Sequence, residues 1–170
     1  MTEIQPASGV ADMGGDSGWG RAPIIDPDEA VFPEKWEGRA FALALLSMRL
    51  SGSNLDAFRH AMNRLDREHY IDDGYYGRWL YGAENLLLDS AIIAPGAVEA
   101  RAANIAGDHV DEPPAPEATK PDYAPTAAGS IREIDAPRKF TVGQRVRAKT
   151  MNAPGHTRLQ KYTQGHVGTV

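Results

Sequence analysis

The sequence predicts an α+β chain: an extended arm, a mostly helical N-terminal half, a linker and the beginning of a small β-barrel. Three observations predict this order. Apolar residues recur at three- and four-residue steps between residues 33 and 93, as on the buried faces of helices. Residues 109–129 are rich in proline and alanine, a composition typical of linkers. From Phe140 on, apolar and polar residues alternate as in a half-buried strand.

These patterns divide the chain into four expected parts. They are an extended N-terminal arm, a helical domain, a Pro/Ala-rich linker and an incomplete barrel domain, over residues 1–30, 31–107, 108–136 and 137–170. The arm is rich in Gly, Pro and Asp, which excludes a long regular element. Its apolar residues Trp19, Ile24 and Ile25 leave two readings open, a floppy tail or an arm lying across another subunit.

Helical periodicity predicts four helices, over residues 33–50, 55–65, 75–93 and 97–107. Pro33 stands at an expected first helical position, and the helix that follows is apolar on more than one side, so we expect it to be central. Asn54 is placed to cap the second helix. In that helix Arg59 lies beside Phe58 at the edge of the apolar face, where it forms either an ordinary ion pair with Asp56 or part of a site.

The C-terminal part predicts two strands, over residues 140–150 and 166–170. Two short strands do not form an independently stable sheet. We therefore expect the opening of a barrel whose remaining strands are missing from the chain or supplied by another one.

Composition excludes several kinds of function. There is no cysteine, which excludes disulfides, a thiolate nucleophile and a cysteine-ligated metal in this chain. The five histidines form no helical i, i+4 pair or carboxylate cluster, so we expect that any metal is held by a partner. No long apolar run or secretory signal is present, and we expect a cytoplasmic chain without a membrane span.

Charge is unevenly distributed along the chain. The net charge is −5, but residues 136–170 hold seven basic and no acidic side chains. This asymmetry indicates two units with different partners.

Seven stretches occur in one order over almost the whole chain: DMGG (Asp12–Gly15), EAVFPEKWE (Glu29–Glu37), LDAFRHAMNRL (Leu55–Leu65), HYIDDGYYGRWL (His69–Leu80), ENLLLD (Glu84–Asp89), PRKFTVGQRVR (Pro137–Arg147) and GHTRLQKYTQGHVGTV (Gly155–Val170). Each alone is weak, but the ordered set resembles the β subunit of nitrile hydratase. The resemblance implies a helical half followed by a linker and an SH3-like barrel.

The resemblance also implies a partner and a reaction. The family hydrates small nitriles to amides as an α/β heterodimer that often dimerises into a heterotetramer, and the β subunit alone would be inactive. Its α subunit binds non-haem Fe(III) or non-corrin Co(III) in a Cys-x-x-Cys-Ser-Cys loop. Neither a nucleic acid nor a membrane is involved.

Two of the family's metal-bound cysteines are oxidised, and two arginines of the β subunit hydrogen-bond their oxygens. By motif these would be Arg59, in Asp-Ala-Phe-Arg, and Arg158, in Gly-His-Thr-Arg. An arginine fork can bond two oxygens at once, which lysine cannot. Tyr75 matches a residue at the substrate pocket. Its alternative reading is an ordinary core aromatic at a helix start.

Three further residues are candidates for the pocket wall or for hydrogen-bonding support: Tyr76, Trp79 and His156. Tyr76 and Trp79 can equally be packing residues, and His156 an ordinary surface turn histidine. Many relatives have a histidine two or three residues after the tyrosine pair, where this chain has Gly77 and Arg78.

Three other functions compete with this reading. The chain can be a subunit of a three-chain relative such as thiocyanate hydrolase. Small cobalt-delivery activators resemble the helical half but lack the Gly-His-Thr-Arg segment, which argues against that role. The basic tail also resembles the opening of SH3-like or KOW modules that bind RNA, and a salt-sensitive affinity for RNA would support a non-catalytic or degenerate fragment.

Overall fold

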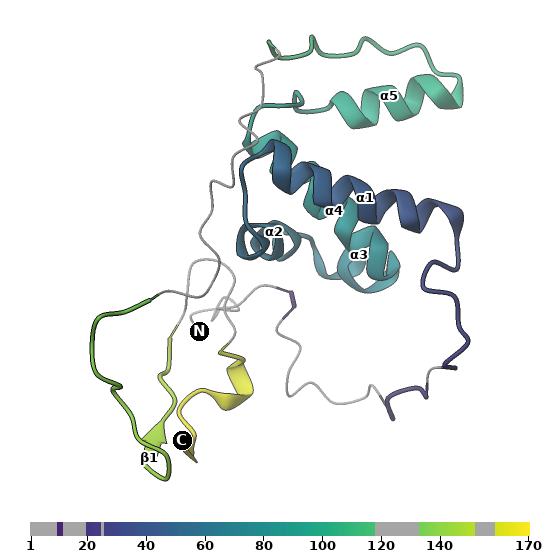
Figure 1. Ribbon diagram of the computed structural model, residues 1–170. Helices are drawn as coiled ribbons and strands as arrows, with labels where there is room; N and C mark the ends of the chain where they lie inside the picture. The colour runs from purple at the N-terminus through teal and green to yellow at the C-terminus, as the bar shows by residue number, and fades with distance from the viewer. Residues whose placement is uncertain (1–9, 12–19, 25, 118–132, 152–158) are drawn as a thin grey trace, which may run out of the picture.

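The computed structural model describes residues 10–11, 20–24, 26–117, 133–151 and 159–170 (Figure 1). The helices are α1 (Lys35–Leu50), α2 (Leu55–Met62), α3 (Arg67–Asp72), α4 (Gly74–Asp89) and α5 (Ala97–Ala106). The strands are β1 (Arg145–Arg147) and β2 (Val167–Thr169), with a short 3-10 helix at Lys161–Thr163. The described part is thus mostly helical with a small sheet, as an α+β chain requires.

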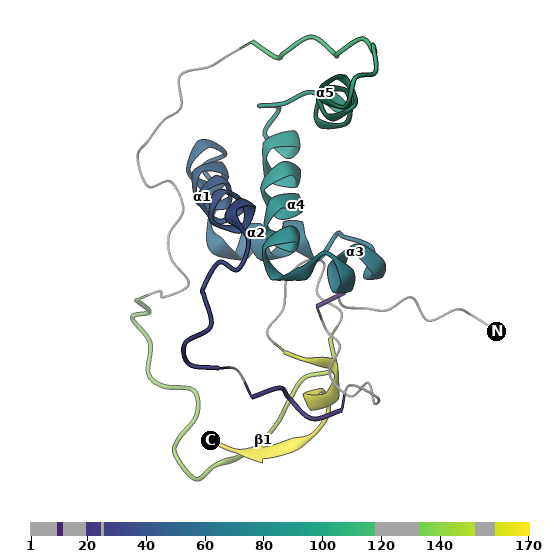
Figure 2. The same ribbon diagram turned by 90° about the vertical axis from the view of Figure 1, so that its right-hand side faces the viewer.

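The central helix of the helical unit is α4. Helices α1, α2 and α3 each pack against it, and the two views show α1 and α4 side by side with α2 across one end (Figures 1 and 2). The expectation that the first helix is central is therefore wrong for this chain alone. Leu43 and Leu46 of α1 are 50% and 57% exposed, because only one face of α1 meets α4.

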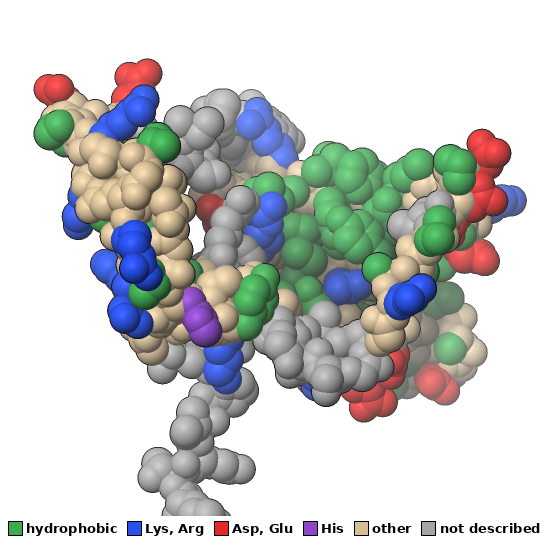
Figure 3. Space-filling model, turned by 90° about the horizontal axis from the view of Figure 1, so that it is seen from below, with side chains coloured by type: hydrophobic (Ala, Val, Ile, Leu, Met, Phe, Trp, Pro, Cys, Tyr) green, Lys and Arg blue, Asp and Glu red, His purple; other side chains and the backbone are tan. Residues whose placement is uncertain are grey.

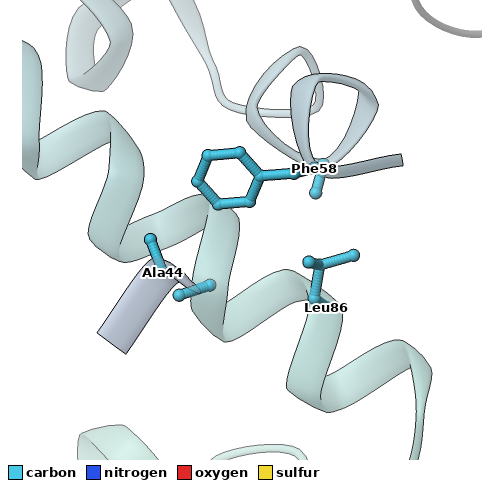
Figure 4. Close-up of a cluster of buried hydrophobic side chains, with 5 residues drawn as sticks. Ala44, Phe58 and Leu86 are labelled. Carbon is cyan, nitrogen blue, oxygen red and sulfur yellow. The ribbon is translucent and has the colours of Figure 1, made fainter. Parts of the chain in front are cut away.

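The core lies where α1, α2 and α4 meet. It consists of small residues around one large ring, namely Ala44, Phe58, Ala61, Ala83 and Leu86 (Figure 4). Phe58 is fully buried. Gly82 permits this packing, because a Cβ there would lie 2.7 Å from Met62 Cγ and 3.0 Å from Phe58 Cε2. Helices α2 and α4 therefore approach closely, which fixes the side chains beside Phe58.

The helix ends follow from their capping residues. Asn54 Oδ1 accepts a hydrogen bond from the Ala57 backbone N–H at 2.9 Å, which confirms the predicted cap of α2. Helix α1 begins at Lys35 because Glu34 and Glu37 form a capping box, so Pro33 lies just before the cap. Helix α3 was missed by periodicity because it spans only six residues and buries none of them.

Helix α5 stands off from the other helices, and residues 108–117 run back along it (Figure 1). Asn104 holds this segment by hydrogen bonds to the Val110 backbone N–H and C=O at 2.9 and 3.0 Å. Arg101 and Glu112 form a two-bond ion pair at 2.7 Å. This hairpin encloses a largely apolar groove of about 490 Å³.

Strands β1 and β2 pair antiparallel, with Val146 opposite Gly168. Both predicted strands are present but shorter than expected, since Val142 lies in the turn before β1 and is 89% exposed. The rest of the expected barrel stays a prediction. None of the described helices is both long and apolar enough to cross a membrane.

Candidate functional site

Arg59 lies on α2 directly after the buried ring of Phe58. Its Nη1 donates a hydrogen bond to Asp56 Oδ1 at 3.3 Å, so the expected ion pair is present. The Arg59 side chain is 30% exposed. Capping by Asn54 and burial of Phe58 fix the backbone of α2, so the guanidinium is held at the surface of the helical unit.

The Arg59 side chain lines a small cavity of about 160 Å³ between α2, α3 and the first turns of α4. The lining combines apolar side chains with two guanidiniums and two phenols: Leu55, Phe58, Arg59, Met62, Tyr70, Tyr75, Arg78 and Trp79. Seen from below, the side on which α2 and α3 lie in Figure 1, hydrophobic side chains gather in one area with basic side chains among them (Figure 3). The cavity can take a small molecule that has an apolar part and a hydrogen-bond acceptor, since apolar side chains and donors both line it.

Tyr75 lies in the first turn of α4 and lines the same cavity as Arg59. Its ring contacts Tyr76 edge-on, with centroids 5.1 Å apart, and Trp79 at 5.6 Å. Tyr75 is 58% exposed, so it is not an ordinary core aromatic. The structure therefore brings two of the three expected principal residues, Arg59 and Tyr75, to one cavity.

Trp79 and Tyr76 have different surroundings. The Trp79 ring packs 5.4 Å from Phe41 and 5.3 Å from Phe58 and lines the cavity. The Tyr76 ring packs 5.1 Å from Phe32, and it does not line the cavity. Of the two, only Trp79 is a wall residue in this structure.

Arg78 also lines the cavity, although sequence reasoning gave it no role. Its guanidinium carbon lies 4.6 Å from the Tyr70 ring centroid and 5.8 Å from that of Tyr75. Its Nε donates a hydrogen bond to the Gly74 backbone oxygen at 3.1 Å. Spacing could have found it, because Tyr75 and Arg78 are three residues apart on one helix face.

The remaining expected site residues, His156 and Arg158, lie outside the described residues, as does the Asp12–Gly15 motif. The expected role of Arg158, a second donor to the partner's oxidised cysteines, stays a prediction.

His69 lies outside the cavity and, contrary to the expectation from the sequence, has two carboxylates beside it, those of Asp66 and Asp73. His69 Nδ1 lies 2.8 Å from Asp73 Oδ2, and this hydrogen bond, together with the charge of Asp66, raises the pKa of His69. Glu84 is partly buried, and burial followed by the charge of Glu99 raises its pKa. Neither His69 nor Glu84 lines the cavity.

The donor chemistry of the cavity suits anions and polar oxygen atoms. Guanidinium and phenol groups donate hydrogen bonds, and a guanidinium does not ligate metal ions. Within the described ranges no group of three or more His, Cys, Asp or Glu side chains could hold a metal ion. The cavity wall therefore offers hydrogen-bond donors and positive charge.

Comparison with known proteins defines the class. The family model described as nitrile hydratase beta subunit, N-terminal, matches residues 7–127, and the corresponding C-terminal model matches residues 129–170. The nitrile hydratase subunit beta of Pseudomonas putida is 32% identical over 95% of this chain and 72% of its own length. The cobalt-containing nitrile hydratase subunit beta of Pseudonocardia thermophila is 31% identical over 96% of this chain and 72% of its own.

Among solved structures, the thiocyanate hydrolase of Thiobacillus thioparus, a recombinant apo-enzyme, matches with a TM-score of 0.43 and 24% identity. The match covers 66% of this chain and 73% of that one. The family matches over both halves of the chain define the class as an enzyme subunit that has a partner subunit. The chain belongs to the nitrile hydratase beta subunit family, which confirms the resemblance read from the ordered motifs.

Proposed function

We propose that this chain is the β subunit of a nitrile hydratase and hydrates nitriles to amides together with a metal-bearing α subunit. The observation that carries the proposal is the cavity that joins Arg59 and Tyr75 in a chain matched by the family over both halves. Its volume of about 160 Å³ suits a small nitrile. We expect the chain alone to be inactive, since it has no cysteine and its described residues form no group that could hold a metal ion.

Arg59 has the clearest role. Its fork would donate two hydrogen bonds to the oxygens of the partner's oxidised cysteines, with Arg158 as a second donor. The short α2 helix and the Asp56 pair already hold the guanidinium at the rim of the cavity. When the partner binds, Arg59 would therefore exchange the half-exposed Asp56 carboxylate for the partner's oxygens, and little side-chain freedom would be lost.

Tyr75 and Trp79 would act on the substrate. The Tyr75 hydroxyl can donate a hydrogen bond to a polar atom of the nitrile or of the attacking water, while Trp79 forms the apolar wall. Non-haem Fe(III) or non-corrin Co(III), held by the α subunit, would supply Lewis-acid activation. A cobalt centre is named for the relative from Pseudonocardia thermophila.

The exposed apolar surface supports an assembly. Leu43, Leu46 and Leu55 are each about half exposed in this chain. Monomeric proteins rarely expose large contiguous apolar areas. We propose that the α subunit covers this side in an αβ unit, two of which form a heterotetramer, and that residues 137–170 contribute the start of an SH3-like barrel.

Co-expression with an α chain that carries the Cys-x-x-Cys-Ser-Cys loop tests the proposal. We expect the two chains to purify together with one iron or cobalt per pair and to convert acetonitrile to acetamide, while this chain alone converts none. Failure to co-purify, or a metal-loaded complex without hydration, would contradict it. Salt-sensitive binding of RNA by the unpartnered chain would then favour the alternative of a non-catalytic RNA-binding module.

A further inference from the structure

The second guanidinium of the cavity, that of Arg78, lies against aromatic rings. Among the described residues no ion pair involves Arg78, and the hydrogen bond to Gly74 uses only Nε. The guanidinium carbon lies over the rings of Tyr70 and Tyr75, and such a cation–π contact does not require the Nη hydrogens as hydrogen-bond donors. Arg78 is therefore a positioned cation with unused donors at the cavity wall.

Arg59 differs from Arg78 in its ion pair and in the use of its donors. Asp56 neutralises Arg59, and under the proposed function its fork is engaged by the partner's oxidised cysteines. Arg78 forms no ion pair within the described part of the chain, and the proposed function gives it no partner oxygen. Apolar side chains such as Leu55, Met62 and Trp79 line the cavity beside Arg78, so its charge is screened less than in bulk water.

We propose that Arg78 is a specificity-determining residue that makes nitriles with a carboxylate group preferred over neutral nitriles of the same shape. This inference rests on the proposed function and assigns the substrate class of that site. The carboxylate would accept hydrogen bonds from the Arg78 Nη atoms while the nitrile group points toward the partner subunit. A charge-assisted hydrogen bond to a planar fork is the strongest contact the cavity wall can offer such a group.

Two substrates of matched shape test the proposal. 3-Cyanopropanoate carries a carboxylate, and 3-cyanopropanamide carries a neutral amide of nearly the same size in the same place. In the purified complex of both chains, Arg78→Gln should raise KM for the carboxylate about tenfold and KM for the amide by clearly less, because the neutral amide loses a hydrogen bond but no charge pairing. Arg78→Lys should keep part of the preference, because it keeps the charge and loses the fork.

The control variant is Arg39→Gln, which removes the same charge from an exposed position of α1 outside the cavity lining. It should leave both KM values unchanged. Binding of the two compounds is also measured by calorimetry, which requires no turnover. The wild-type complex should bind the carboxylate more tightly, and Arg78→Gln should abolish the difference.

Two results would overturn the inference. One is equal affinity of the wild-type complex for the two compounds, and the other is an equal loss in Arg78→Gln and Arg39→Gln. A failure of the proposed function has a different signature, because acetonitrile and both test compounds would then remain unhydrated while calorimetry still reports whether Arg78 selects the carboxylate.

Discussion

Arg59 Nη1 lies 3.3 Å from Asp56 Oδ1, one helical turn back along α2. The two side chains are 30% and 48% exposed, so an i, i+3 pair of this kind contributes only about 0.3–0.5 kcal/mol to stability. Its main effect is geometric. The pair holds the Arg59 guanidinium beside the cavity. Because the pair is weak, an anion that binds Arg59 more strongly can replace Asp56.

Replacement of Arg59 by lysine should lower kcat for acetonitrile by roughly 10- to 100-fold, the loss expected when one charge-assisted hydrogen bond is removed. Lysine keeps the charge but cannot bond two oxygens at once. The measurement is steady-state hydration by the metal-loaded complex, with thermal unfolding of the same sample. Arg64→Lys is the control, because Arg64 pairs with Asp89 outside the cavity lining. Equal activity losses in the two variants would refute a special role for Arg59.

Gly82→Ala should destabilise the chain by about 1–3 kcal/mol, because the added methyl would overlap Met62 and the Phe58 ring. Gly38→Ala is the matched control. Gly38 lies in α1, where a Cβ would meet the Phe32 ring at an ordinary 3.7 Å, so alanine there should stabilise by about 0.5–1 kcal/mol. Urea unfolding followed by circular dichroism measures both. Effects of the same sign would contradict the close approach of α2 and α4.

Asn54→Ala should cost about 1 kcal/mol, since the Ala57 N–H loses its acceptor at the start of α2. Asn54→Asp keeps an acceptor oxygen and should retain most of the stability. The same unfolding assay applies. Because α2 carries Arg59, we also expect the alanine variant to lower hydration activity, and an unchanged rate would show that the cap is not needed to place the guanidinium.

His69 should titrate above its ordinary pKa of 6.5, chiefly because of its hydrogen bond to Asp73. A raised folded-state pKa gives stability that is fully present below pH 6.5 and is lost as pH rises through the folded value. NMR titration of the imidazole C–H signals measures it. Asp73→Asn should lower the pKa of His69. Asp72→Asn removes the charge next to Asp73 in the sequence and should leave the pKa of His69 unchanged.

The Arg101–Glu112 pair should hold residues 108–117 along α5. Hydrogen bonds from Arg101 and Asn104 lower the pKa of Glu112, so the stabilisation is present above about pH 4.5 and is lost as pH falls through the folded value. Glu112→Gln should speed amide hydrogen exchange at Val110, whose N–H is bonded to Asn104. Glu117→Gln, further along the segment, should not. Equal exchange in both variants would show that the pair does not hold the segment.

Much of the helical unit was predictable from local pattern. The caps and the recurring apolar residues placed α2, α4 and α5 close to where they lie, because these signals act within one helical turn. Helix α3 was not predictable from apolar periodicity, because it has no buried face. The position of α1 at the edge was also unpredictable, since periodicity shows that a face is apolar but not which chain covers it.

By itself the sequence determined the order of the strands and of every helix but α3, the absence of cysteine ligands and the ordered motifs that define the family. The tertiary structure alone decided that Arg59, Tyr75 and Arg78 share one cavity and that Tyr76 lies outside it. The physical reason is that local spacing assigns residues to a helix face, whereas the packing of Phe58 against Gly82 sets how two helices approach and which of their side chains meet.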